Sequence, residues 1–335
     1  MEITRQMLLK IAEETAAKRV LANPEILAVF LHGAILGEQP LLGGTADVDL
    51  TFIYEQGFAR REFLRLTDEV HLDINHHPKD KYQPARGLRI DPWLGPTVYY
   101  CRSLHDPKHF IDFTQASVRG MFDEVENVTA RAQALLEEAR QEWQQCRDLT
   151  HESIPQQVDG FLRALFLAAN AAASLTGPPI TERRLLLDLP QRAHACGRPG
   201  LYAGVLGLLG AAHADAQTVC DWLPAWEAAF LAAQTLANRP PPLHASRRHY
   251  YQRAIQAMLQ SAQPQNAYWL LLYTWTQAIE TLPPDSAHQP AWVQAGDQLN
   301  LLGKHLENKL EGLDVLLDSV AEVLGSWGKE YLSAK

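Results

Sequence analysis

Two carboxylates stand one residue apart at the start of an apolar stretch, Asp47 and Asp49 in "ADVDLTFIY". Alternate side chains of a strand share a face, so both acids point to one side, and Val48 and Leu50 point to the other. Carboxylates this close repel each other unless a cation lies between them, and hard oxygen ligands favour Mg²⁺. The pair therefore indicates a metal site, although Asp-x-Asp is also a common turn pattern that stays solvated.

A third acid, Asp73, lies in the alternating stretch "EVHLDIN" (69–75), whose apolar residues take the other face. If this stretch pairs with the strand of Asp49, the three carboxylates share one face of a sheet. Such a set can hold two Mg²⁺ ions about 4 Å apart and clamp both oxygens of an in-line phosphoryl displacement. Asp73 is then also placed to take the proton of an attacking hydroxyl.

The elements that must position these acids alternate in the first third of the chain. The pattern predicts strands at 26–32, 49–54, 69–75 and 97–101, helices at 3–21 and 107–121, a short helical stretch after residue 54, and a Pro/Gly-rich loop at 78–96. A glycine-rich loop that begins at Gly33 joins the first two strands. Its glycines allow close backbone approach to a phosphate.

Beyond residue 125 the strand signals end and apolar residues recur at helical spacing. A leucine-rich seam from Leu299 to Leu324 predicts packing inside a helical bundle, with a homodimer interface as the alternative. The predicted fold class is an α+β domain at 1–124, with a mixed sheet flanked by helices, followed by an all-α bundle at 125–335.

Composition limits the functional classes. A formal net charge of −9 argues against binding a nucleic-acid polymer. Four scattered cysteines fit a reducing cytosol. The charged N-terminus is no signal peptide, and the longest apolar run, Leu201–Ala212, is too short to cross a bilayer. We therefore expect a cytoplasmic protein without a membrane segment.

The set of motifs resembles the nucleotidyltransferase superfamily that includes DNA polymerase beta. Its signature is a Gly, then Gly or Ser, then 9 to 13 residues, then Asp-x-Asp or Asp-x-Glu, with a third acid on a later strand. Here Gly33-Ala34 is followed by twelve residues (35–46), Asp47-Val48-Asp49 and then Asp73. The resemblance implies Mg²⁺-dependent transfer of a nucleoside monophosphate, AMP from ATP or the equivalent from another NTP, to a hydroxyl of a small-molecule acceptor.

The helical second domain makes the aminoglycoside adenylyltransferases the most similar members. In those, an acid opens a helix that ends in Thr-Gly and is followed by a Lys; here the corresponding residues are Asp159, Thr176-Gly177 and Arg183. By this resemblance Asp159 binds an amine or hydroxyl of the acceptor, Arg183 approaches the phosphates, and the helical domain acts as a lid. Ordinary alternatives are a helix-initial acid for Asp159 and a solvated helix start for Arg183.

Two departures from the signature leave the activity open. Ala34 and Ala46 stand where the family usually has Ser, so nucleotide affinity should be reduced, and Thr45 is a substitute hydroxyl. One alternative function is therefore a catalytically weak nucleotide-binding or antitoxin-like protein. Another is transfer of the nucleotide to a protein side chain.

Four other features of the sequence allow more than one interpretation. Trp93 either lines a substrate pocket or anchors a loop. The histidines of "HLDINHHP" favour solvated or sheet-edge positions over a zinc site. The spacing of Arg239 and His244 matches a ribonuclease motif that belongs on a helix, which the three intervening prolines exclude. The basic, aromatic segment 246–253 favours a solvated helix face over a contact with phosphate.

Overall fold

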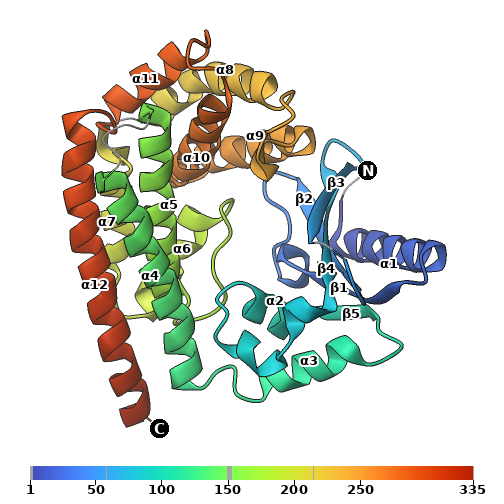
Figure 1. Ribbon diagram of the computed structural model, residues 1–335. Coiled ribbons are helices and arrows are strands. Elements are labelled where there is room, and N and C mark those ends of the chain that lie inside the picture. Colours follow the sequence, from blue (N-terminus) through green and yellow to red (C-terminus); the bar gives the residue numbers. More distant parts are fainter. Residues whose placement is uncertain (1–2, 58, 149–152, 214, 335) are drawn as a thin grey trace. The chain divides into compact units, whose positions relative to one another are not determined.

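The computed structural model describes residues 3–57, 59–148, 153–213 and 215–334 (Figure 1). The chain divides into two compact units, Met1–Val128 and Thr129–Lys335. The first contains a sheet and the second is helical, which confirms the predicted fold class. The two units are described separately below.

A mixed sheet forms the centre of the first unit, and the described residues supply five strands in the order β3-β4-β2-β1-β5. β2 and β4 run parallel, and the other neighbours are antiparallel. The strands are β1 (Ile26–His32), β2 (Ala46–Tyr54), β3 (Arg60–Arg65), β4 (Val70–Pro78) and β5 (Arg102–His105). The pairing of β2 with β4 is the arrangement that the acid triad requires.

Helices cover both faces of this sheet. On one face α1 (Arg5–Ala22) packs Leu8, Ala12 and Ala16 against the apolar side chains of β1, β2 and β4. Its first turn is capped by Thr4, whose Oγ1 accepts the N–H of Met7. On the other face lie α2 (Leu94–Tyr100), α3 (Phe110–Arg119) and two short 3₁₀ turns at Lys79–Tyr82 and Ala85–Arg89. Because side chains alternate along β2, the acids point away from α1.

Two sequence predictions in this unit are wrong. The stretch after residue 54, predicted as helical, contains the edge strand β3. Residues 97–101, predicted as a strand, belong mostly to α2, and β5 begins only at Arg102. The helix forms despite its aromatic residues because Asp91 Oδ1 accepts the N–H groups of Trp93 and Leu94. These bonds and the burial of Val98 in the core both stabilise the helix against the strand preference of its side chains.

An ion-pair network joins α1 to the sheet on the face away from the acids. Arg19 donates to both oxygens of Glu62 at 2.8 Å, and Nε2 of His76 lies 3.1 Å from Glu62 Oε2. Nδ1 of His76 lies 2.9 Å from the Tyr54 hydroxyl. Arg19, then His76, lowers the pKa of Glu62 to about 2, while burial lowers the pKa of His76.

Glu62→Gln is therefore expected to destabilise the fold in a pH-dependent way. The depressed pKa of Glu62 means that its carboxylate stabilises the protein above the unfolded-state value near 4.5, and that this contribution is lost as the pH falls toward 2. Urea unfolding at pH 7 should show a loss on the order of 1–3 kcal/mol, and none at pH 2. Glu13→Gln, which breaks an exposed pair with Arg102, should cost less than about 1 kcal/mol. A pH-independent difference for Glu62→Gln would contradict this account.

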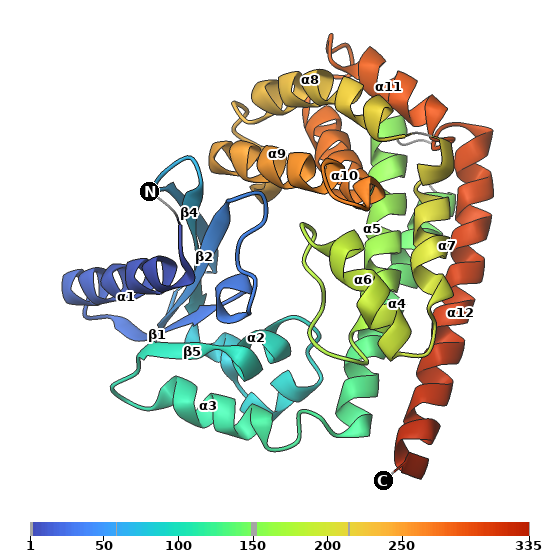
Figure 2. The same cartoon turned by 180° about the vertical axis from the view of Figure 1, so that it is seen from behind.

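The second unit is built around α5, which is buried on nearly all sides and packs against α6, α10 and α12 (Figure 2). Its described helices are α4 (Val125–Asp148, beginning in the first unit), α5 (Ile154–Ala173), α6 (Leu185–Ala195), α7 (Gly200–Leu208), α8 (Ala216–Ala233), α9 (Ala245–Leu259), α10 (Ala267–Thr281), α11 (Gln289–Gln298) and α12 (Lys304–Ala334), with 3₁₀ turns at Ala211–His213, Pro241–Leu243 and Pro264–Asn266. The seam from Leu299 to Leu324 is buried, and α12 lies against α5 and α7. The seam thus packs inside the bundle, and homodimerisation stays a prediction.

Among the helices that the structure describes, none combines the length and the apolar character that crossing a bilayer requires.

Candidate active site

The register of β2 and β4 brings the three acids together. Asp49 pairs directly with Asp73, and Asp47 pairs with His71. One carboxylate oxygen from each of Asp47, Asp49 and Asp73 lies within 4.8 Å of the others. Asp73 is almost fully buried, with 1% exposed, whereas Asp47 and Asp49 are half-buried. Alternation along two parallel strands therefore gathers the carboxylates on one face, as the sequence predicts.

Gly33 packs its backbone against this cluster. It follows β1 with a φ of 80°, a conformation that favours glycine. A Cβ at this position would overlap Asp49 Oδ2 and lie 2.8 Å from Asp49 Cγ. The position therefore requires glycine for two reasons, its backbone angle and the closeness of the carboxylate.

Arg61 is a site residue that the sequence analysis missed. From β3 its Nε donates to Asp73 Oδ1 at 2.7 Å and its Nη2 donates to Asp73 Oδ2 at 2.5 Å. Its guanidinium carbon also lies 4.9 Å from the ring centre of Phe63. The segment was predicted to be helical, which hid this contact. The turn-forming residues on both sides, Gly57 and Asp68 among them, were the available signal for a short strand.

His32 pairs with Asp49 across β1 and β2, and its Nε2 lies 3.0 Å from Thr51 Oγ1. Burial lowers the pKa of His32 to about 4, although the charges of Asp73 and Asp47 act in the opposite direction. The imidazole is therefore neutral at pH 7 and adds no positive charge to the acids.

The donor set fits a hard divalent cation. Three carboxylates of one sheet face offer oxygens within 4.8 Å of one another, which is the ligand chemistry of Mg²⁺ rather than of a thiolate or imidazole metal. The histidines do not extend the cluster. His71 and His76 are buried on β4, an interior strand, so neither the solvated nor the sheet-edge position predicted for them holds. Nδ1 of His77 lies 2.7 Å from the Tyr82 hydroxyl. In the described part of the chain, the acid triad is the group with metal-binding geometry.

The loop residues that the resemblance implicates lie close by in sequence but differ in exposure. Ala34 is half-buried at the start of a 3₁₀ turn, Ala34–Leu36. Thr45 is fully buried, and its hydroxyl donates to the Leu42 carbonyl at 2.9 Å. In this conformation the Thr45 hydroxyl serves the turn that leads into β2.

Asp159 and Arg183 lie in the helical unit. Asp159 is in the second turn of α5, 5% exposed, with Arg163 Nε at 3.2 Å and Gln277 Nε2 at 3.5 Å. Burial raises its pKa. The alternative of a helix-initial acid, stabilised by the helix dipole, would place it in the first turn instead.

Two arginines are buried in that unit: Arg183, for which a solvated helix start was the alternative to a phosphate contact, and Arg247, whose segment was predicted to be a solvated helix face. Arg183 is 6% exposed, and its guanidinium carbon lies 3.5 Å from the ring centre of Tyr250. Arg247, in the segment 246–253, is 3% exposed and lies 3.3 Å from Glu182. Both arginines thus line the same tyrosine, since Arg247 also approaches Tyr250 at 5.7 Å.

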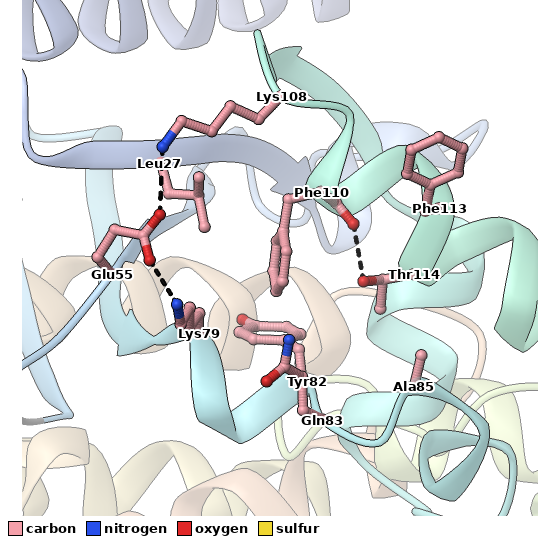
Figure 3. Close-up of a pocket in the computed structure, with 10 residues that line it drawn as sticks. All are labelled: Leu27, Glu55, Lys79, Tyr82, Gln83, Ala85, Lys108, Phe110, Phe113 and Thr114. Atoms are coloured by element: carbon pink, nitrogen blue, oxygen red, sulfur yellow. Dashed lines mark hydrogen bonds and ion pairs between the residues drawn. The ribbon is translucent and has the colours of Figure 1, made fainter.

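A pocket of about 420 Å³ lies elsewhere on the first unit (Figure 3). Phe110 and Tyr82 lie side by side in it, and Glu55, directly after β2, is held by Lys79 at 2.5 Å and Lys108 at 3.3 Å. None of the described residues that line this pocket is a predicted site residue. Trp93 is 42% exposed at the start of α2 and is not among them.

No protein-family model matches the chain, and no curated protein matches it. Among solved structures it is similar to a nucleotidyltransferase-like protein from Exiguobacterium sibiricum 255-15, with 12% identity, 94% of this chain and 91% of that chain covered, and a TM-score of 0.34. At that TM-score, any assignment depends on the geometry of the sheet. A mixed sheet with Asp47, Asp49 and Asp73 on two parallel neighbours fits the polymerase beta-like nucleotidyltransferase superfamily.

Proposed function

We propose that the chain is a Mg²⁺-dependent nucleotidyltransferase that transfers a nucleoside monophosphate, AMP from ATP as the first expectation, to a hydroxyl of a small molecule and releases pyrophosphate. The observation that carries this proposal is the acid triad on β2 and β4. The proposed family activity also explains why Gly33 follows β1, because its missing side chain leaves the carboxylate of Asp49 and the loop backbone accessible.

In this proposal Asp47 and Asp49 hold two Mg²⁺ ions, and Asp73 completes one of the two sites. Bound Mg²⁺ would supply charge neutralisation at the triphosphate and at the attacking and leaving oxygens. Asp73 accepts the proton of the acceptor hydroxyl as its oxygen bonds to the α-phosphorus and the bond to pyrophosphate breaks. The backbone that begins at Gly33 and Ala34 cradles the β- and γ-phosphates, with Thr45 as an additional contact if its turn opens.

The helical unit is proposed to select the acceptor and to act as a lid. Asp159 is the proposed contact for an amine or hydroxyl of the acceptor, which would replace its present partners Arg163 and Gln277. Arg183 is the proposed contact for the nucleotide phosphates, and Trp93 is proposed to contact the acceptor. An aminoglycoside-like antibiotic is one acceptor of suitable chemistry, since its amines and hydroxyls match a buried carboxylate.

A second candidate is a nucleotide-binding, antitoxin-like protein that turns over slowly. Two observations favour it: the Thr45 hydroxyl is bonded to Leu42, so it does not replace the missing serines, and Arg61 occupies both oxygens of Asp73. A nucleotidyltransferase that modifies a protein side chain uses the same chemistry and differs in its acceptor.

Thermal unfolding with each of four NTPs, with and without Mg²⁺, tests the proposal. One NTP at about 100 times its Kd should add roughly 2.7 kcal/mol of stability to the wild type only when Mg²⁺ is present. Asp49→Asn should lose this stabilisation. Pyrophosphate release with a panel of small hydroxyl acceptors then separates the enzyme from the binding protein. Stabilisation without turnover would favour the second candidate, and a nucleotide adduct on a co-expressed protein would favour the third.

A further inference from the structure

Arg61 and Asp73 form a bidentate ion pair at the centre of the acid triad. Two guanidinium N–H groups donate to the two carboxylate oxygens at 2.7 and 2.5 Å. The Asp73 side chain is 1% exposed, whereas that of Arg61 is 43% exposed. Charge-assisted bonds of this fork geometry are among the stronger hydrogen bonds in proteins. The carboxylate that should complete a metal site and accept a proton is therefore engaged by a residue of this chain.

In the protein without metal, the ion pair offsets part of the repulsion between the three carboxylates. Three carboxylates within 4.8 Å of one another repel strongly, and the most buried of them has the least help from water. Arg61 supplies one positive charge directly to that carboxylate. A buried carboxylate that loses a bidentate counter-charge destabilises the fold, so this contact should contribute to stability when no metal is bound.

Arg61 has a second contact, with the ring of Phe63, that it can keep when Asp73 changes partner. It stands on β3, the edge strand of the sheet, with its guanidinium over the ring of Phe63 at 4.9 Å. A guanidinium that leaves Asp73 keeps this ring contact and stays next to the acids. The charge is then available to an anion that arrives with the metal, and a triphosphate is such an anion.

We infer that Arg61 is a positioning residue that holds Asp73 until the metal-bound nucleotide arrives, and that it then exchanges the carboxylate for the phosphates. This inference rests on the proposed nucleotidyltransferase function. Metal alone must displace a cation from Asp73 and therefore binds weakly. Metal with nucleotide gives Arg61 a new partner, so the two ligands bind with positive coupling in the wild type.

The experiment measures Mn²⁺ affinity of the full chain by electron paramagnetic resonance, with no nucleotide present. Arg61→Gln is expected to tighten Mn²⁺ binding by about tenfold or more, because a charged bidentate partner of one ligand is removed. Arg61→Lys keeps the charge but not the fork, and it should tighten binding by a smaller factor. The matched control is Arg60→Gln, which removes the same charge from the neighbouring residue, whose side chain alternates to the opposite face of β3.

A second readout does not depend on metal affinity. In EDTA, Arg61→Gln should unfold at a lower temperature than the wild type, and Mn²⁺ should restore more stability to it than to the wild type. Equal or weaker Mn²⁺ binding by Arg61→Gln and Arg61→Lys than by the wild type overturns the inference. Asp49→Asn distinguishes failure of the Arg61 inference from failure of the proposed function. If Asp49→Asn abolishes Mn²⁺ binding, the acid triad binds metal, whatever the result for the Arg61 variants. If the wild type and Asp49→Asn bind Mn²⁺ alike, the metal site itself is wrong and the inference is overturned with it.

Discussion

Asp49→Asn is expected to lower kcat/KM for nucleotidyl transfer by at least about 10³-fold, since a metal contributes several kcal/mol of charge stabilisation in the transition state. Asn is nearly isosteric with Asp, so the close approach of Asp49 to Gly33 is kept. What is lost is one negative charge next to Asp47 and Asp73. The measurement is pyrophosphate release at saturating Mg²⁺ with the NTP that stabilises the wild type.

Stability separates lost chemistry from lost folding in this variant. Removing one of three mutually repelling carboxylates should leave the unfolding temperature in EDTA unchanged or raise it, so activity should be lost without a loss of stability. Glu55→Gln is the control, because it neutralises a carboxylate just beyond the other end of β2 that pairs with two lysines. Its rate should stay within about twofold of the wild type. Near-normal transfer by Asp49→Asn would mean that the triad does not hold the catalytic metal.

The acid triad could be predicted from sequence because its positions depend on local periodicity. In β2 and β4 an apolar residue occupies every second position over most of the strand, and this fixes which side chains share a face. The pairing of Asp49 with Asp73 then needs the two strands to be neighbours in the observed register. The resemblance to nucleotidyltransferases supplied that adjacency, which periodicity alone does not.

Arg61 could not be predicted in the same way. β3 reads "RREFLR", with charged residues on both faces, as an edge strand tolerates but an alternation pattern does not reveal. Helix α2 was missed for a different reason, because the bonds from Asp91 and the burial of Val98 both act against the strand preference of its side chains. Each error concerns an element whose local pattern is weak and whose identity depends on a specific hydrogen bond or neighbouring strand.

The positions of the buried charged side chains in the helical unit could not be predicted without knowledge of the tertiary structure. Arg247 donates a hydrogen bond to Glu182, which is 65 residues away in sequence, and Asp159 accepts one from Gln277, which is 118 residues away. A solvated helix start is the ordinary alternative for Arg183 because charged side chains are usually exposed. Only the packed bundle shows that it lies over Tyr250. Side chains that pair over such separations cannot be placed from the spacing of one helix.

Gly33→Ala is expected to damage both the fold and the metal site. A non-glycine residue at a φ of 80° costs about 1–2 kcal/mol, and the added Cβ would overlap the Asp49 carboxylate. The total loss of unfolding free energy should therefore reach about 2–3 kcal/mol or more. Mn²⁺ affinity should fall as well, since Asp49 must move. Gly57→Ala is the control: it also has a positive φ, but its Cβ would meet no described atom within 4 Å, so strain alone should remain.

A double-mutant cycle tests the overlap directly. In an Asp49→Ala background the carboxylate that would collide with the new Cβ is gone, and the remaining Asp49 Cβ lies 3.2 Å from the Cβ position at Gly33. Gly33→Ala should then cost less than in the wild type, because only the backbone strain and this one tight contact remain. Urea unfolding of the four proteins should give a coupling energy of roughly 1 kcal/mol or more. Additive losses would contradict the packing of Gly33 against Asp49. Coupling together with lost Mn²⁺ affinity in Gly33→Ala would mean that this glycine supports the metal site by keeping Asp49 in position.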